Sequence, residues 1–235
     1  MHILITGTSR GLGEGLALHY LDRGDKVFGI SRNDNRGLEK HQNFKFLPLD
    51  LSDFDGIRNK LPGFLVEAGH IDIAILNAGV LGEIKDMGEC SLDEIERVMD
   101  INVWANKVLI DTMYENLERI SQVVAVSSGA AVLGNRGWNA YSISKAALNM
   151  MIKLYARERE ETHFSAIAPG LIDSAMQDYI YSLADDPRFP SLRRLKDAKS
   201  GGEMPSAGEA AETLAKAVIK AHNEESGSFI DVREI

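Results

Sequence analysis

Residues 2–13 read His2-Ile3-Leu4-Ile5-Thr6-Gly7-Thr8-Ser9-Arg10-Gly11-Leu12-Gly13. The first five are a short apolar run typical of a buried strand, and a helical pattern begins at Gly11. Glycines between a strand and a helix permit a tight turn, and the exposed N–H groups at a helix start attract phosphate. This context predicts a strand–turn–helix unit that binds the pyrophosphate of a dinucleotide. The alternative is a glycine-rich turn that serves packing alone.

Beyond this stretch, short apolar runs alternate with helical patterns along the whole chain. Several runs are apolar without polar alternation, which is typical of strands buried on both faces of a parallel sheet. We therefore predict a doubly wound, Rossmann-type α/β fold of about seven strands with helices on both faces, in one domain over residues 1–235. The expected strands are His2–Thr6, Lys26–Ser31, Phe44–Asp50, Ile71–Asn77, Gln122–Ser127, Phe164–Ala168 and Ser228–Val232. The expected helices are Gly11–Asp22, Asp53–Glu67, Ser91–Asn116, Asn139–Glu161 and Ser206–His222, the third opened by a capping box at Ser91-Leu92-Asp93-Glu94.

Composition excludes several classes of protein. Among 235 residues, 44% are hydrophobic and 26% are charged, which is ordinary for a globular chain. The net charge of −9 disfavours nucleic acid as a partner. Cys90 is the single cysteine, which excludes an intramolecular disulfide and a cysteine-based zinc site, and the six histidines show no metal-ligand spacing. With no run long enough to span a membrane and no leader, we expect a cytoplasmic protein without a metal.

Two arginines bear on the choice of dinucleotide. The second expected strand ends at Ser31 and Arg32, where a site for NAD would place a carboxylate against the ribose 2′-hydroxyl. Arg32, together with Arg10 from the glycine-rich turn, suits a 2′-phosphate instead. We therefore expect NADP(H) to be preferred over NAD(H). Asp34 follows closely, so a shift of the strand end by a residue or two would weaken the preference.

Polar residues also end the third and fourth expected strands. Asp50 and Asn77-Ala78-Gly79 lie at the carboxyl edge of the sheet, where ligands bind in such folds. Asp50 has an alternative role as the cap of the helix that begins near Ser52, and Asn77 has one as a turn residue.

Tyr141 and Lys145 stand four residues apart in an expected helix, so both project from one face. A phenol has a pKa near about 10, and a nearby ammonium favours the phenolate and lowers that value. The pair is therefore a candidate acid for a carbonyl oxygen that gains negative charge.

Ser128 follows the fifth expected strand, and its hydroxyl is a candidate donor to the same carbonyl oxygen. Ser127 is the adjacent candidate, although alternate strand residues face opposite sides. Asn102 falls on the apolar stripe of Ile95 and Met99. It is either a buried structural amide or the holder of a water that feeds protons to Lys145, and the sequence leaves both open.

Together these residues resemble the short-chain dehydrogenases/reductases. The glycine-rich turn, Asn77-Ala78-Gly79, Asn102, Ser128, Tyr141-Ser142-Ile143-Ser144-Lys145 and Pro169-Gly170 occur in the order and spacing of that family, over nearly the whole chain. The resemblance implies hydride transfer between a nicotinamide and a carbonyl or alcohol. It implies that Tyr141 is the general acid/base, that Ser128 positions the substrate oxygen, that Lys145 binds the nicotinamide ribose and that Asn102 holds a relay water. The cofactor contacts that we expect are Gly7, Ser9, Arg10, Gly11, Leu12, Gly13, Ser31, Arg32, Asp50, Leu51, Asn77, Ala78, Gly79, Tyr141, Lys145, Pro169, Gly170, Ile172 and Ser174.

Within the family the chain is similar to the group of sepiapterin reductases and bacterial benzil reductases. The similar stretches are Ser31–Asp34, Gly137–Tyr141, Asp173–Gln177 and Ser226–Asp231. That group uses NADPH, and in sepiapterin reductases an Asp at the position of Asp231 anchors the pterin. Two features depart from the family pattern. The short segment from Asn33 to Asn43 suggests a missing helix, and Ser174 replaces the usual threonine.

The segment at about 173–205 is expected to be irregular and to cover the substrate. Its apolar and aromatic residues (Met176, Tyr179, Tyr181, Leu183 and Phe189), with Trp138 nearby, favour an aromatic or bulky ketone or diketone. The same residues equally suit packing of the segment on the body, or a dimer contact. The resemblance further implies a homodimer or homotetramer that assembles through the helices containing Asn102 and Tyr141. A catalytically silent NADP(H)-binding sensor or interaction protein is the alternative function, which the retained Tyr141 and Lys145 disfavour.

Overall fold

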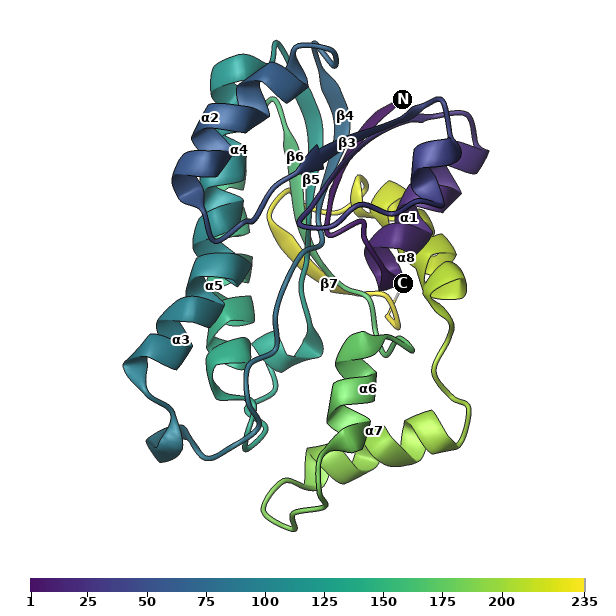
Figure 1. Cartoon of the computed structure of the whole chain (residues 1–235). Helices are drawn as coiled ribbons and strands as arrows, with labels where there is room; N and C mark the ends of the chain where they lie inside the picture. Colours follow the sequence, from purple (N-terminus) through teal and green to yellow (C-terminus); the bar gives the residue numbers. More distant parts are fainter. Residues whose placement is uncertain (235) are drawn as a thin grey trace.

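The computed structural model describes residues 1–234, and its centre is one parallel sheet (Figure 1). The sheet has the order β3-β2-β1-β4-β5-β6-β7, as a doubly wound fold requires. Every prediction of a strand is confirmed, and no end differs by more than two residues. The strands are β1 (His2–Thr6), β2 (Lys26–Ser31), β3 (Phe44–Pro48), β4 (Ile71–Leu76), β5 (Ile120–Val126), β6 (His163–Ala168) and β7 (Ser228–Asp231).

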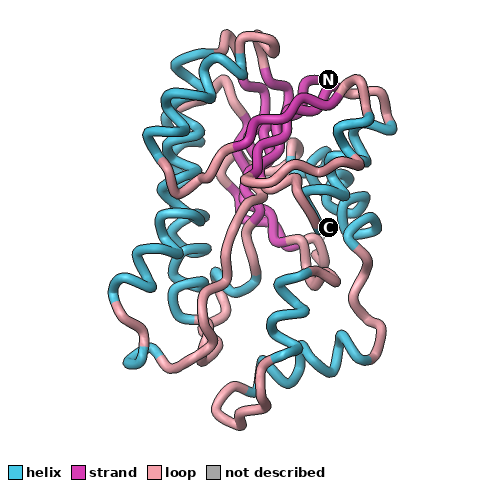
Figure 2. The backbone as a smooth tube through the Cα atoms, viewed as in Figure 1, coloured by secondary structure: helices cyan, strands magenta, loops and turns pink. Residues whose placement is uncertain are grey.

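Helices cover both faces of the sheet, as Figures 1 and 2 show. On one face lie α2 (Phe54–Leu65), α4 (Ala105–Asn116) and α5 (Asn139–Glu158), and on the other lie α1 (Gly11–Asp22) and α8 (Ala207–Ala221). The sheet therefore has two hydrophobic cores: the first lies between the sheet and α2, α4 and α5, and the second lies between the sheet and α1 and α8. Because side chains alternate along a strand, Leu4 of β1 packs in the first core, while Ile3 and Ile5 pack in the second. No helix of residues 1–234 combines the length and apolar character needed to cross a bilayer.

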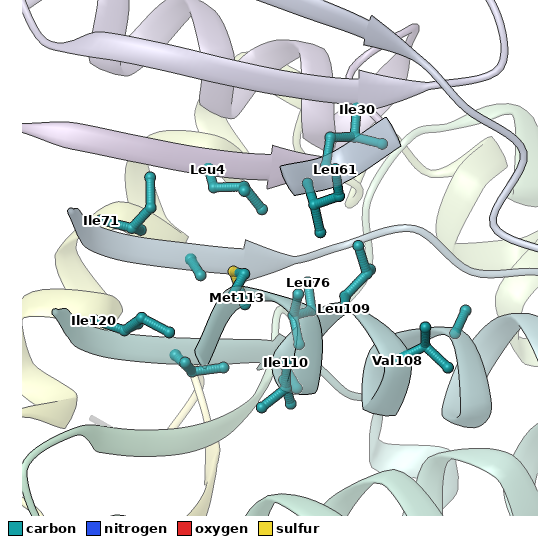
Figure 3. Packing of buried hydrophobic residues seen from close by; sticks show 14 of the residues in the cluster. Leu4, Ile30, Leu61, Ile71, Leu76, Val108, Leu109, Ile110, Met113 and Ile120 are labelled. Atoms are coloured by element: carbon teal, nitrogen blue, oxygen red, sulfur yellow. The ribbon is translucent and has the colours of Figure 1, made fainter. Parts of the chain in front are cut away.

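The first core fixes the framework of the sheet (Figure 3). Leu61 of α2, with Leu109 and Met113 of α4, packs against Leu4 and Leu76 of adjacent strands, and all five side chains are almost completely buried. Burial of each such side chain contributes about 1.5–3 kcal/mol. A rigid sheet therefore holds the loops that leave its carboxyl edge.

The long helix expected over Ser91–Asn116 is not continuous. It is divided into α3 (Leu92–Met99) and α4 by a π turn over Asp100–Trp104. The capping box is confirmed, since the Ser91 and Glu94 side chains each accept from the other's backbone N–H. A π turn inserts a residue into the helical repeat, often at functional sites, and here it contains Asn102.

The expectation of an irregular segment over residues 173–205 is wrong, because it forms two helices. They are α6 (Ala175–Ser182) and α7 (Pro190–Ser200), and they lie beyond the carboxyl edge of the sheet in Figure 1. Pro190 occupies the first turn of α7, where a proline suits a helix, and Leu192 and Leu195 then form a buried stripe. The expected absence of a full helix after β2 is confirmed, since only a 3₁₀ turn over Leu38–Lys40 occurs there.

Candidate active site

Two adjoining clefts open at the carboxyl edge of the sheet, and Asn77 and Gly79 line both. The β2 cleft has a volume of ≈ 420 Å³, and the expected site residues that line it are Gly7, Ser9, Arg10, Ser31, Arg32, Asp50, Leu51, Asn77, Ala78 and Gly79. The β5 cleft has a volume of ≈ 260 Å³, and the expected site residues that line it are Leu12, Asn77, Gly79, Ser128, Trp138, Tyr141, Lys145, Pro169, Gly170, Ile172, Ser174, Met176 and Asp231. The structure therefore brings nearly all the expected residues together. Gly11, Gly13 and Asn102 line neither cleft.

Two glycines of the glycine-rich turn, Gly7 and Gly13, are packed too tightly for a side chain. Gly7 has φ +79°, and a Cβ there would lie 2.9 Å from the Asn77 amide nitrogen. A Cβ on Gly13 would lie 2.2 Å from the carbonyl oxygen of Gly7, so Gly13 acts by letting α1 approach the turn. Among residues 1–234, no side chain caps the N-terminus of α1.

Asn77 ties the ends of two strands together. Its side chain donates to the Thr6 carbonyl oxygen at 2.9 Å, and its backbone N–H donates to the Thr6 hydroxyl at 3.0 Å. Asn77 is therefore more than a turn residue, because these bonds fix the floor that the two clefts share.

Opposite charges line the β2 cleft. Arg10 and Arg32 both line it, and so do Asp34 and Asp50. The Asp50 carboxylate accepts from the N–H and hydroxyl of Ser52, and these bonds, with a smaller contribution from Arg32, lower the pKa of Asp50. The alternative role of Asp50 as a helix cap is wrong, because Asp53 is the N-cap residue of α2.

Ser128, Tyr141 and Lys145 converge in the β5 cleft. Burial raises the pKa of the Tyr141 phenol, and a hydrogen bond with the Ser128 side chain lowers it by a smaller amount. Burial also lowers the pKa of Lys145 to about 8. The Lys145 Nζ donates to the Val126 carbonyl oxygen at 2.8 Å and lies 5.7 Å from the centroid of the Tyr141 ring.

The expected depression of the Tyr141 pKa by Lys145 is therefore wrong for the site as the structure has it. Loss of water around the phenol is the largest effect, and the ammonium is engaged by a backbone carbonyl instead. The hydroxyl that is hydrogen-bonded to the Tyr141 phenol is that of Ser128, whereas the Ser127 hydroxyl donates to Asn149 Oδ1 at 2.6 Å.

The buried side-chain amide of Asn102 makes three hydrogen bonds. Its Oδ1 accepts from Val80 N–H at 2.8 Å, while its Nδ2 donates to the Val80 carbonyl and to the Ser144 hydroxyl, each at 2.9 Å. Ser144 in turn donates to the Tyr141 carbonyl oxygen at 2.7 Å. These contacts are those of a structural amide, and through Ser144 they link the π turn to the backbone of Tyr141.

Segment 173–205 closes one side of the β5 cleft through both apolar and ionic contacts. The Trp138 indole N–H donates to the Ser191 hydroxyl at 2.8 Å, and Trp138 packs with Phe189 and Leu192. Asp86 accepts from Arg136 at 2.5 and 2.7 Å and from Arg188 at 3.0 Å, which joins three loops. We call this trio the Asp86 clasp.

The aromatic and apolar residues of this segment divide into two groups. Met176 lines the β5 cleft, whereas Tyr179, Tyr181, Leu183 and Phe189 do not. Phe189 and Leu183 pack the segment against the body, and Tyr181 is half exposed. The packing interpretation therefore holds for Leu183 and Phe189.

Asp231 is not free in the cleft. Arg233 donates to both of its carboxylate oxygens, at 2.8 and 2.5 Å, and this pairing lowers the pKa of Asp231. Ser174 is the N-cap residue of α6 and lines the β5 cleft, and within residues 1–234 its hydroxyl makes no capping hydrogen bond.

Sequence reasoning missed several residues that line the β5 cleft. Among them are Leu133, Asn135, Gln177, Ile180, Arg194 and Arg233. A helical pattern over Ala175–Ser182 and Pro190–Ser200 is the signal that could have found the residues on α6 and α7. Within residues 1–234 no three His, Cys, Asp or Glu side chains are grouped as they would be to hold a metal ion.

Comparisons with known proteins identify the family of the chain. The family model for short chain dehydrogenases matches residues 1–183. A benzil reductase ((S)-benzoin forming) of Bacillus subtilis is 30% identical, with 98% of each chain covered.

Two solved structures share the fold. The YIR035C short-chain dehydrogenase/reductase from Saccharomyces cerevisiae superposes with a TM-score of 0.86 at 26% identity, with 98% of this chain and 95% of that chain covered. A Shigella flexneri short-chain dehydrogenase solved with NADP has a TM-score of 0.80 at 23% identity, with 99% and 96% of the two chains covered. The chain is an oxidoreductase that belongs to the short-chain dehydrogenase/reductase family.

Proposed function

We propose that this protein reduces the carbonyl group of an aromatic or bulky ketone or diketone to an alcohol, with NADPH as the reductant. The observation that carries the proposal is the convergence of Ser128, Tyr141 and Lys145 in one cleft beside the glycine-rich turn. The Bacillus subtilis relative supports the substrate class, since its name is that of a benzil reductase that forms (S)-benzoin.

The protonation states suit reduction. Because burial raises the pKa of Tyr141, the phenol carries its proton at neutral pH and is able to donate it to a carbonyl oxygen. The Ser128 hydroxyl lies beside the phenol and can donate to the same oxygen as negative charge develops. Lys145, with a pKa of about 8, is mostly cationic at pH 7 and stabilises that charge.

The residues of the two clefts and of the glycine-rich turn fit a dinucleotide. The uncapped start of α1, the close approach of Gly13 to Gly7 and the Ser174 hydroxyl provide a pyrophosphate cradle and a contact for a carboxamide. When bound, the nicotinamide supplies the hydride. Arg10 and Arg32 would hold a 2′-phosphate, while Asp34 and Asp50 line the same cleft.

An exchange of charge tests the choice of NADPH over NADH. Arg32→Asp should lower the kcat/KM ratio for NADPH over NADH by about 10–100-fold, since charged hydrogen bonds contribute about 1.5–3 kcal/mol. Arg36→Asp is the matched control, because Arg36 is also near β2 but does not line the cleft. An unchanged ratio in Arg32→Asp would contradict the preference for NADPH.

Oxidation of NADPH with benzil tests the reaction itself, since reduced nicotinamide absorbs at about 340 nm. The expected result is turnover, and stronger activity with aromatic diketones than with small aliphatic ketones. Binding of NADPH without turnover across a broad carbonyl panel would instead favour a sensor that does no chemistry.

An exposed apolar stripe on α5 supports assembly into a homodimer or homotetramer. Ile143, Met150 and Leu154 are each at least 42% exposed on this helix, and Trp104 before α4 is 45% exposed. Such a stripe is costly to leave in water. Light scattering on the purified wild-type protein should therefore give a mass of two or four chains. Leu154→Glu should lower that mass. A wild-type mass of one chain would refute this assembly.

A further inference from the structure

The charged residues that line the β5 cleft have a net positive charge, although the whole protein has a net negative charge. The charged residues that line the cleft are Lys145, Arg194, Asp231 and Arg233. Arg233 neutralises Asp231 through two hydrogen bonds, so this pair adds no net charge. Lys145 and Arg194 therefore leave two uncompensated positive charges in a chain whose formal net charge is −9.

Arg194 differs from the cations around it on segment 173–205. Arg188 pairs with Asp86 and Asp186, Lys196 with Asp185, and Lys199 with Asp173 and Asp178. No carboxylate of residues 1–234 lies within salt-bridge distance of Arg194. Its neighbour Arg193 lies outside the cleft and acts on Asp185, whose pKa it helps to lower.

The two cations come from different walls of the cleft. Lys145 lies beside Tyr141 on α5, where the carbonyl group would react, and Arg194 projects from α7 on the covering segment. Apolar side chains also line the cleft, among them Leu133, Trp138 and Met176. A ligand that matches this lining has an apolar body, a carbonyl group at the Tyr141 end and a negative charge at the α7 end.

We propose that the substrate is a keto acid with an aromatic or bulky apolar body, whose carboxylate is bound by Arg194. This inference rests on the proposed carbonyl reduction and names the substrate class more closely. A guanidinium binds a carboxylate through paired N–H donors, which fixes its orientation as well as its charge. Arg194 acts here as a specificity-determining residue and takes no part in proton transfer.

The test compares aryl keto acids with their methyl esters, which differ in charge but hardly in shape. Benzoylformate, 3-benzoylpropionate and 4-benzoylbutyrate, each with its ester, place the carboxylate at increasing distances from the ketone. We expect at least one acid to be reduced with a higher kcat/KM than its ester. Arg194→Gln should lower that acid/ester ratio about tenfold, a modest effect because Arg194 is exposed.

Arg193→Gln is the control and should leave the ratio unchanged, while Arg194→Lys should retain part of the preference. Added salt should lower kcat/KM for the acid but not for the ester. An acid/ester ratio that is the same in Arg194→Gln and wild type would overturn the inference, as would an equal fall in Arg193→Gln.

Two further measurements show which of the proposed interactions fails. A rise in the Kd of NADPH in Arg194→Gln, without a change in the acid/ester ratio, would assign Arg194 to a cofactor phosphate and overturn the proposal. If the wild-type protein reduces the esters and benzil but shows no preference for any acid, the proposed function stands and this inference fails. If it reduces none of them, the proposed function fails first.

Discussion

Replacement of Lys145 by Met should make the folded protein more stable at neutral pH, although it should abolish activity. Lys145 is 4% exposed, and burial lowers its pKa from 10.5 to about 8. At about 1.36 kcal/mol per pKa unit, this shift costs the folded state about 3 kcal/mol at pH 7. The lost hydrogen bond to the Val126 carbonyl offsets about 1 kcal/mol of that, so the net gain in unfolding free energy is about 2 kcal/mol.

The gain in unfolding free energy should become smaller as the pH rises above about 8. Below pH 8 the lysine is protonated in both states and the whole cost is present. Between about pH 8 and 10.5 the folded state releases its proton while the unfolded state keeps it, so the cost fades. At pH 9.5 the remaining cost is about 1 kcal/mol, which the lost hydrogen bond cancels.

Urea unfolding of Lys145→Met and wild type at pH 7.0 and 9.5 measures the difference in unfolding free energy at each pH. At pH 7.0 the midpoint of thermal unfolding should also rise by about 4–8 °C. Lys153→Met on the same helix is the control, because Lys153 is exposed, and its effect should not change with pH. A gain in Lys145→Met that is absent at pH 7.0, or equally large at pH 9.5, would refute the reasoning.

Three further predictions concern the turn and the covering segment. Gly13→Ala should destabilise the protein and weaken NADPH binding in titrations, because its Cβ would lie 2.2 Å from a carbonyl oxygen, whereas Gly63→Ala, with open space around it, should do neither. Asp86→Asn should speed limited proteolysis within residues 183–189, since it removes the carboxylate of the Asp86 clasp; unchanged cleavage would show that apolar contacts alone hold the segment. Gly137→Ala should raise KM for the carbonyl substrate with an unchanged Kd for NADPH, because φ is +94° and the Cβ would lie 2.8 Å from the Phe189 ring; an unchanged KM would contradict this.

The sheet could be predicted from the sequence because its strands are short apolar runs without alternation. Such runs fit a parallel sheet covered on both faces, and the observed strand order is that of a doubly wound fold. The two helices of segment 173–205 could not be predicted in the same way, because prolines and paired aspartates ordinarily indicate breaks. Pro190 in fact begins α7, and the spacing of Leu192 and Leu195 is the signal for its buried face.

The residues of the site could be predicted as a set, but their electrostatics could not. Tyr141 and Lys145 line one cleft, as their helical spacing predicts. The directions of their pKa shifts depend on burial and on the Val126 carbonyl, which no local pattern reveals. Likewise the π turn at Asn102 shifts a helical repeat by one residue without a distinct sequence signal.

The most direct test is the single-turnover rate of benzil reduction by Tyr141→Phe with bound NADPH. We predict a fall of about 10²–10⁴-fold, as expected when a positioned proton donor is removed. The Kd of NADPH should rise by no more than about tenfold, the effect of one lost hydrogen bond. Reduction at the wild-type rate by Tyr141→Phe would contradict delivery of the proton by the phenol between Ser128 and Lys145.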